Sequence, residues 1–405
     1  MNFNLKYFPL FRSLISMMAW LPIFFMYFSQ VIPLNQVLIL EALYYISVVV
    51  LEIPSGYFSD VIGRRTTLII SSLSFTISYI IFGFIDPTFI SLLVAQIFLA
   101  CGMSFLSGTD TSFYYETLKE LNLTDQYVNY AAKVESQKQI ASAVAVLSGG
   151  LAGYFHLNWA YILSFIFVIP TLFLTFKFKE PLASDKANQK LQFFSQIKAL
   201  GNELKQRELR WLLMFSLFLF ILAHIPYEFY QPYLQLLETN DLSFGFNAAI
   251  FSGIIFAITR LIGGYAAHKS PAWLNRYGLK KLCFIALGLQ LIIISLMGFI
   301  LHIGIVLIVL LRSFSMSLVA APINAEIAPR VKESNRASYF SFQSLLSRLS
   351  YSLTLVFLSF IAGSNTNNWS SLSTILIVTS IIGVLFFVPL IMIKAGNLFN
   401  TNSRF

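Results

Sequence analysis

Three acidic side chains stand inside or at the ends of long apolar stretches in the first half of the sequence: Glu41, Glu52 and Asp110. An ionisable side chain within a transmembrane helix costs at least ~2.5–3.5 kcal/mol, so each is a candidate for function. Glu41 and Glu52 are eleven residues apart, which is three helical turns and places both on one helix face. All three carboxyls are candidates for proton coupling. The alternative for Glu52 and Asp110 is a structural pair with the polar loop that follows Glu52.

In the second half, the charges inside apolar stretches are mostly basic: Arg260, Arg312 and Arg348. The planar guanidinium matches the geometry of carboxylate and phosphate groups. Arg348 and Arg312 are therefore candidates for binding an anionic substrate. The alternative is internal pairing with Glu228 or with the acids of the first half, and this is the preferred interpretation for Arg260.

A polar stretch with two prolines interrupts another apolar run. His224 and Glu228 flank Pro226, and Pro232 follows shortly after. This pattern predicts a locally broken helix, which is a frequent place for the binding site of a transporter. The substrate-binding candidates from this stretch are His224, Tyr227, Glu228, Tyr230 and Gln231.

The composition of the chain is typical of a membrane protein. The 405 residues are 57% hydrophobic and 11% charged, whereas soluble domains have about 25% charged residues. A span of roughly 20 apolar residues crosses the hydrocarbon core. Twelve such runs are present, at about 12–30, 36–58, 67–85, 88–113, 131–155, 158–177, 210–235, 243–267, 281–301, 303–327, 337–363 and 369–394.

The distribution of positive charge predicts the orientation in the bilayer. With the N-terminus in the cytoplasm, 24 of the 27 Lys and Arg residues fall on the cytoplasmic side, and the other three are the arginines inside helices. This is the positive-inside rule, and it predicts that both termini are cytoplasmic in a bacterial-type inner membrane. The net charge of +9 is spread over short loops and forms no patch with interleaved aromatics, so a nucleic-acid partner is not expected.

The longest polar stretch divides the chain into two sets of six spans. The sequence thus predicts an N-terminal half over 1–178, a cytoplasmic linker over 179–209 and a C-terminal half over 210–405. Apolar residues at 193, 197, 200 and 204 have helical spacing, so part of the linker is either a helix along the membrane surface or a solvated connection.

The loop between the second and third spans carries a motif, Gly56-Tyr-Phe-Ser-Asp60-Val-Ile-Gly63-Arg64-Arg65. Glycines allow a tight turn and close helix approach, and an acid beside arginines makes a charge cluster that can hold one conformation. The motif resembles the signature loop of the major facilitator superfamily, G-x-x-x-D-x-x-G-[RK]-[RK], at the same place in the first half. The resemblance implies a gating role for Gly56, Asp60, Gly63, Arg64 and Arg65.

The resemblance extends over nearly the whole chain. Glu52-Ile-Pro-Ser-Gly56, Gly108-Thr-Asp110 and Arg336-Ala-Ser338 are similar to segments of one functionally mixed branch of this superfamily. A degenerate copy of the loop, with His268 in the place of the acid, follows the eighth span. The family resemblance implies an all-α membrane protein with twelve transmembrane helices in two pseudo-symmetric six-helix halves, and a central site between them.

Other functional classes find little support. The sequence has no phosphate-binding G-x-x-x-x-G-K-[ST] loop, so energy from ATP is not expected. Four scattered histidines and two distant cysteines make no catalytic or metal-ligand group. We therefore expect no enzyme activity, no cofactor and no metal.

The sequence thus predicts a secondary transporter that moves a small organic solute, of anionic type, by proton-coupled alternating access and functions as a monomer. One alternative is multidrug efflux by proton antiport. That activity favours an acid-lined cavity for cations, and drug antiporters of this superfamily usually have a Gly-Pro pair that is absent after Gly149. A further alternative is a membrane sensor with the same fold.

Overall fold

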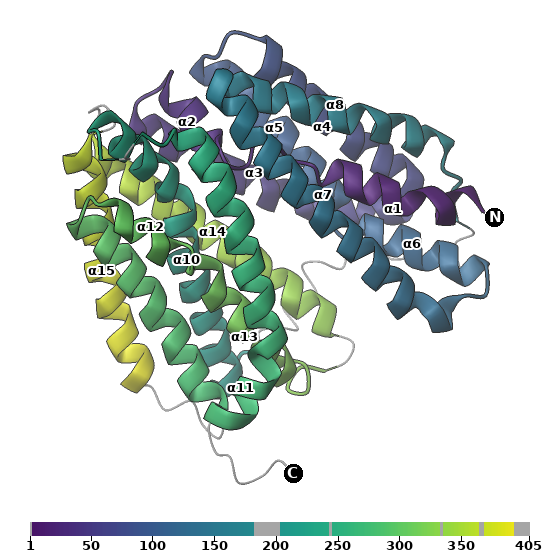
Figure 1. Ribbon diagram of the computed structural model, residues 1–405. Coiled ribbons are helices and arrows are strands. Elements are labelled where there is room, and N and C mark those ends of the chain that lie inside the picture. The colour runs from purple at the N-terminus through teal and green to yellow at the C-terminus, as the bar shows by residue number, and fades with distance from the viewer. Residues whose placement is uncertain (1, 182–202, 243–244, 333–334, 364–367, 393–405) are drawn as a thin grey trace. The chain divides into compact units, whose positions relative to one another are not determined.

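The computed structural model describes residues 2–181, 203–242, 245–332, 335–363 and 368–392, and every regular element in these segments is helical (Figure 1). The helices of the first part of the chain are α1 (Phe3–Ile15), α2 (Phe24–Ser29), α3 (Leu34–Val61), α4 (Arg64–Phe84), α5 (Phe89–Leu106), α6 (Thr109–Glu120), α7 (Tyr127–Phe155) and α8 (Leu157–Lys177), with a 3-10 turn at Thr124–Gln126. The second part contains α10 (Arg207–Thr239), α11 (Ala248–Phe299), α12 (Ile303–Val309), α13 (Arg312–Ile327), α14 (Arg336–Ala362) and α15 (Trp369–Met392). The all-α architecture predicted from the sequence is confirmed.

The chain folds into two compact units. Unit 1 comprises Met1–Ile32, Ile39–Leu191 and Ala249–Ile254, and unit 2 comprises Pro33–Leu38, Gln192–Ala248 and Ile255–Phe405. The predicted surface helix of the linker, at residues 193, 197 and 200, lies outside the described residues.

Nine helices in the described part of the chain are long and apolar enough to cross a membrane, and all twelve predicted spans overlap helix. Three features explain why nine helices pass this criterion although twelve spans were predicted. The first predicted span is split into two short helices, α7 begins with a polar segment, and α11 contains two predicted spans. These two spans of α11 meet at Gly278, whose backbone is left-handed with φ 75°.

The first predicted span, 12–30, is not one continuous helix. α1 begins at Phe3 and ends at Ile15, and the chain then turns through residues 16–23 before α2. Pro22 lies in this turn and has no N–H to donate. The turn packs against Gly149 of α7 so closely that a Cβ at this position would overlap the Ala19 carbonyl oxygen. The small residue at 149 therefore serves packing.

The prediction of a broken helix at Pro226 and Pro232 is wrong. α10 is continuous over both prolines, because neighbouring helices can supply partners for the backbone groups that a proline disrupts.

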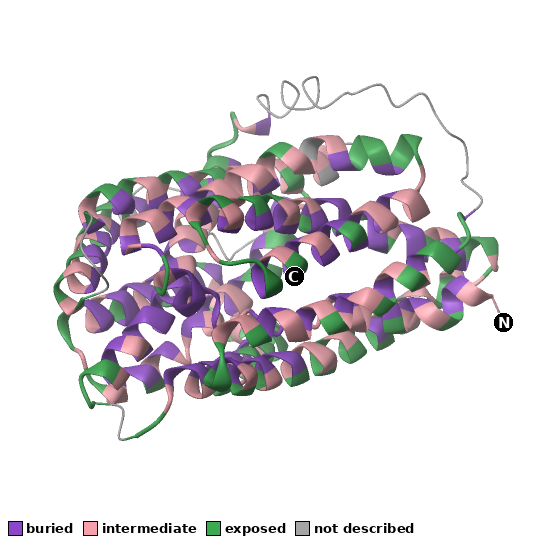
Figure 2. Cartoon of the chain, turned by 90° about the horizontal axis from the view of Figure 1, so that it is seen from above, coloured by how far each residue is buried: buried purple, intermediate pink, exposed green. Residues whose placement is uncertain are grey.

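The breaks lie elsewhere. Residues 310–311 separate α12 from α13, so Arg312 is the first residue of α13. Residues 107–108 separate α5 from α6, and Gly108 adopts φ 75° there. The helix breaks thus place two predicted site residues, Arg312 and Asp110, in the first turn of a helix. Buried and exposed residues alternate along most of the helices (Figure 2), whereas α2 and the second half of α10 are mostly buried.

Candidate functional site

The signature loop is mostly helix. α3 continues to Val61, so Gly56 and Asp60 lie on its last turns, and the chain reverses at Gly63. Gly63 has φ 109°, a conformation that side chains with a Cβ rarely adopt. α4 begins at the next residue, Arg64. The requirement for glycine at this position is therefore set by the backbone.

A carboxylate caps the helix that begins after this turn. Glu180, just beyond α8, accepts hydrogen bonds from the backbone N–H groups of Arg64 at 2.6 Å and Arg65 at 2.8 Å. The first N–H groups of a helix have no partner within the helix and carry a partial positive charge, so an acid is favourable there. A Cβ at Gly63 would lie 2.8 Å from the Glu180 carboxyl. The glycine thus makes room for the cap.

The arginines of the loop connect it to two further helices of unit 1. Arg64 forms ion pairs with Asp60 at 2.6 Å and with Glu116 of α6 at 3.2 Å. Arg65 donates to the carbonyl of Phe176 at 2.7 Å, in the last turn of α8. The loop therefore fastens the ends of α3, α4, α6 and α8 together.

Among the acids proposed for proton coupling, Glu41 lies deepest. Its side chain on α3 is 5% exposed, and its Oε1 accepts a hydrogen bond of 2.8 Å from Nε2 of Gln96 on α5. Gln96 is itself 3% exposed. Glu52, three turns further along α3, is half-buried, and its carbonyl accepts from the Ser55 hydroxyl.

Asp110 is part of an ion pair. Its Oδ2 lies 3.0 Å from Nη2 of Arg12 on α1, and both side chains are largely buried. The Oδ1 atom accepts from the N–H of Thr111, which places the carboxylate on the N-terminal turn of α6, where the helix dipole favours it. Asp110 thus pairs with α1 rather than with the signature loop.

In unit 2, Arg312 is enclosed by aromatic rings. Its guanidinium carbon lies 5.0 Å from the ring centre of Tyr230, 5.2 Å from that of Tyr227 and 5.3 Å from that of Phe256. Its side chain is 6% exposed, and its Nε has no hydrogen-bond acceptor among the described residues. Arg260, on the same helix as Phe256, also lies over the Phe256 ring at 5.1 Å, but Arg260 is exposed. We call Tyr227, Tyr230 and Phe256 the aromatic cage.

The remaining candidates of α10 lie around the aromatic cage. Glu228 and Gln231 are fully buried. The His224 ring stacks on Phe220, with 3.8 Å between ring centres, and its Nδ1 contacts the Phe220 carbonyl at 2.8 Å. Arg312 and Arg348 both lie close enough to His224 for their charges to act on the imidazole. The structure therefore brings the predicted substrate-binding residues of unit 2 into one neighbourhood.

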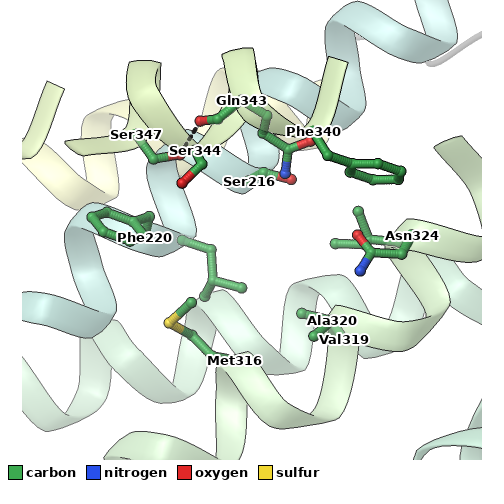
Figure 3. Close-up of a pocket in the computed structure, with 12 residues that line it drawn as sticks. Ser216, Phe220, Met316, Val319, Ala320, Asn324, Phe340, Gln343, Ser344 and Ser347 are labelled. Carbon is green, nitrogen blue, oxygen red and sulfur yellow. Dashed lines mark hydrogen bonds between the residues drawn. The ribbon is translucent and has the colours of Figure 1, made fainter. Parts of the chain in front are cut away.

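A cavity of about 200 Å³ lies beside this charged cluster, between α10, α13 and α14 (Figure 3). Side chains of α13, such as Met316, point into it from one side, and Gln343, Ser344 and Ser347 of α14 point into it from the other. Its lining residues are Ser216, Leu219, Phe220, Met316, Val319, Ala320, Ile323, Asn324, Phe340, Gln343, Ser344 and Ser347. None of these side chains carries a charge.

Helical spacing connects this cavity to the charged cluster. Residues four apart are neighbours along a helix face. His224 follows Phe220 by four residues, Arg348 follows Ser344 by four, and Arg312 precedes Met316 by four. On each of the three helices, a histidine or an arginine thus lies one turn beyond a residue that lines the uncharged cavity.

Sequence reasoning missed the residues that complete these sites. Gln96 was detectable as a polar residue in an apolar run, and Glu180 as an acid directly after the sixth span. Glu116 and Phe256 carried no comparable signal, because their roles arise from contacts between distant helices. The serines and amides of the cavity are single polar residues in apolar stretches, and only packing distinguishes them from ordinary helix positions.

The degenerate copy of the loop in unit 2 also reverses at a glycine with positive φ. Gly264 and His268 lie on α11, and the reversal occurs at Gly278 with φ 75°. Arg276 lies over the ring of its neighbour Tyr277, at 5.3 Å. Nothing lies within 4 Å of a Cβ built on Gly278.

The fold and these sites define a multi-pass helical membrane protein with a solute-sized cavity. The family model of the major facilitator superfamily matches residues 10–355, and the chain belongs to this superfamily. It is a membrane transporter and not an enzyme. A comparison with curated proteins found no match.

Solved transporter structures share the fold at low sequence identity. The nucleoside transporter NupG is 15% identical with a TM-score of 0.79, and the match covers 97% of this chain and 100% of that one. The peptide transporter PepTSo of the POT family is 12% identical, with a TM-score of 0.69 and coverage of 97% and 99%. A D-xylose-proton symporter is 13% identical, with a TM-score of 0.66 and coverage of 94% and 97%.

Proposed function

We propose that the protein carries a small anionic organic solute across the inner membrane by proton-coupled alternating access, as a monomer with both termini in the cytoplasm. The orientation rests on the distribution of Lys and Arg in the loops. The two six-helix halves predicted from the sequence, 1–178 and 210–405, are the moving parts in this proposal. The signature loop, with Gly56, Asp60, Gly63, Arg64 and Arg65, acts in gating by holding four helix ends of unit 1 together.

One observation carries the choice of an anionic solute: the buried guanidinium of Arg312 in its aromatic cage. Burying a charge costs several kcal/mol, and rings offset part of this through their negative faces. Rings do not supply the hydrogen-bond acceptors that the guanidinium also needs. A carboxylate or phosphate group of the solute would supply both charge and acceptors. Arg348 adds a second positive charge in the neighbourhood of His224.

The cavity explains how the rest of the solute is held. Its lining is uncharged, with hydroxyl and amide groups among aromatic and aliphatic side chains. In this arrangement the anionic group of the solute faces Arg312 and Arg348, and the uncharged remainder lies between α13 and α14. Glu228, His224, Tyr227, Tyr230 and Gln231 position the arginines and border the anion.

Proton coupling is assigned to the acids of unit 1. Glu41 is the best placed of the three, because it is buried and its hydrogen-bond partner is a neutral amide. A carboxyl next to an amide has a partner in either protonation state, whereas Asp110 is already engaged in an ion pair with Arg12 at 3.0 Å. Glu52 is a second candidate along the same face of α3.

The experiment is a ligand screen on the purified protein. Small carboxylates and phosphate esters, together with their uncharged amide and alcohol analogues, are tested for raising the unfolding midpoint in detergent. A ligand at 100 times its Kd stabilises by about 2.7 kcal/mol. We expect anionic compounds to stabilise the protein and Arg312→Gln to weaken their binding at least about tenfold, because charged hydrogen bonds contribute about 1.5–3 kcal/mol. Arg276→Gln, which also removes an arginine from a tyrosine ring but at an exposed site, is the matched control.

The uncharged lining of the cavity also supports a second candidate, a neutral polar solute. The solved structure of a nucleoside transporter shares the fold. If the uncharged analogues stabilise the protein as well as the acids do, and Arg312→Gln leaves their binding intact, this second candidate replaces the first. Stabilisation by organic cations would instead support the multidrug alternative.

A further inference from the structure

The Glu41–Gln96 pair contains a buried acceptor that lacks a donor. Nε2 of Gln96 donates to Oε1 of Glu41 at 2.8 Å, while Oε1 of Gln96 has no hydrogen-bond donor among the described residues. Both side chains are almost fully buried, at 5% and 3% exposure. A buried polar atom without a partner costs about 1–3 kcal/mol. With Glu41 as a carboxylate, the pair therefore lacks one hydrogen-bond donor.

A protonated Glu41 supplies that donor. A carboxylate can only accept hydrogen bonds, but a carboxylic acid also has one O–H to donate. A primary amide and a carboxylic acid can face each other with two hydrogen bonds, amide N–H to carboxyl oxygen and carboxyl O–H to amide oxygen. Each polar atom of the pair then has a partner, and the pair carries no net charge.

No ion pair to Glu41 occurs within the described ranges. The titratable side chains one turn along α3 are Tyr44 and Tyr45, and α4 contributes Tyr79, whose hydroxyl accepts from Trp20. All three are phenols, which are neutral at physiological pH. The amide of Gln96 is the group that contacts the Glu41 carboxyl directly.

We infer that Glu41 and Gln96 together form the proton-binding site, in which Gln96 stabilises both forms of the carboxyl: it donates to the carboxylate and both donates to and accepts from the acid. Gln96 is a positioning residue, because it exchanges no proton itself. This inference deepens the proposed coupling role of Glu41 and rests on it. The proton binds to a carboxylate oxygen and leaves from the same oxygen, so no other reactant is needed.

The test needs no substrate. Infrared spectra of the purified protein in lipid are recorded over a range of pH, and the C=O stretching band of buried carboxylic acids is followed. We expect a band in the wild-type protein that Glu41→Gln removes. Glu41→Gln should fold normally, because a second amide can form the same two hydrogen bonds with Gln96.

Gln96→Met then tests the role of the amide, since methionine is unbranched and of similar length. We expect the Glu41 band to shift to higher frequency, because a carboxylic acid without a hydrogen bond has a stiffer C=O bond. Gln290→Met is the matched control: Gln290 is also a buried glutamine whose Oε1 lacks a donor, but its amide donates to the Arg312 carbonyl. This control should leave the band in place.

An unchanged band frequency in Gln96→Met, or a wild-type spectrum without a band that depends on Glu41, would overturn the inference. Failure of the proposed function looks different. A solute whose uptake ignores the pH gradient would refute proton coupling, while the carboxyl band and its dependence on Gln96 would remain.

Discussion

The two units treat their internal charges differently. In unit 1, arginines meet acids: Arg12 pairs with Asp110 at 3.0 Å, and Arg64 with Asp60 at 2.6 Å. In unit 2, the buried Arg312 is surrounded by aromatic rings, and an uncharged cavity begins one turn away. Unit 2 also has an ion pair, between Arg330 and Glu326 at the end of α13, but Arg312, its most buried arginine among the described residues, has rings around it.

The ion pairs of unit 1 suit a structural role, whereas the aromatic cage around Arg312 suits the binding of a ligand. An ion pair within one unit is satisfied at all times, so it fastens helices without needing anything from outside. An aromatic cage supplies about 2 kcal/mol or more at a desolvated site but leaves the positive charge of the arginine in place. In the proposed function, this charge binds the anionic group of the solute. The following variants test whether the two kinds of site differ in this way.

The largest effect is expected from Asp110→Asn. Removing one partner of a buried ion pair leaves an uncompensated charge, which destabilises by about 3–5 kcal/mol. Here that charge is Arg12, whose side chain is 14% exposed. The unfolding midpoint in detergent micelles measures the loss. The double variant Arg12→Gln with Asp110→Asn should recover most of it, and a double variant as unstable as the single one would show that the pair does not act as a unit.

The second prediction compares the two glycine turns. Gly63→Ala forces a left-handed backbone on alanine, at roughly 1–2 kcal/mol, and its Cβ also meets the Glu180 carboxyl at 2.8 Å. Losing this cap adds about 1 kcal/mol. Gly278→Ala has the same backbone strain with open space around the Cβ, so its loss of unfolding free energy should be smaller by about 1 kcal/mol. Equal losses in the two variants would mean that Glu180 contributes nothing to the signature loop.

The all-α fold was predictable because hydropathy is a property of whole segments rather than of single residues. Hydropathy over 20 residues is insensitive to any one contact, and every predicted span overlaps a helix. Local features were less predictable. The prolines of α10 looked like a helix break, but the helix continues over both of them, as packed helices in a bundle allow. The breaks before α2 and α13 have weaker sequence signals, because they depend on how the turn packs, as at Gly149.

The candidate site was predictable in part for a similar reason. Buried charges such as Glu41 and Arg312 stand out in an apolar sequence, since each is costly in the membrane. Their partners stand out less. Gln96 is detectable only as a single polar residue in an apolar run, and Phe256 is an ordinary residue for a membrane helix. They become part of a site when α5 approaches α3 and when α11 approaches α13.

The third prediction concerns the aromatic cage itself. Arg312→Lys keeps the charge, so the cost of burying it remains, but the ammonium cannot stack flat against several rings. The unfolding free energy should fall by about 1–2 kcal/mol, measured by denaturation in detergent. Tyr230→Leu in the wild-type background should reproduce part of the loss. If lysine is as stable as arginine at 312, stacking on the rings is not what holds this side chain.

The smallest effect is expected at Arg260, which shares the Phe256 ring with Arg312. The two guanidinium carbons lie at nearly the same distance from the ring centre, 5.1 Å and 5.3 Å. They differ in burial, because Arg260 is exposed while Arg312 is 6% exposed.

A cation over a ring at an exposed site contributes about 0.5–1 kcal/mol, since water competes for the charge. Arg260→Lys should therefore change the unfolding free energy by at most about 0.5 kcal/mol, measured under the same conditions as Arg312→Lys. The two sites share one ring and one substitution, and they differ in burial and in the two further rings around Arg312. A loss at 260 as large as that at 312 would show that neither the exclusion of water nor the additional rings strengthens the aromatic cage.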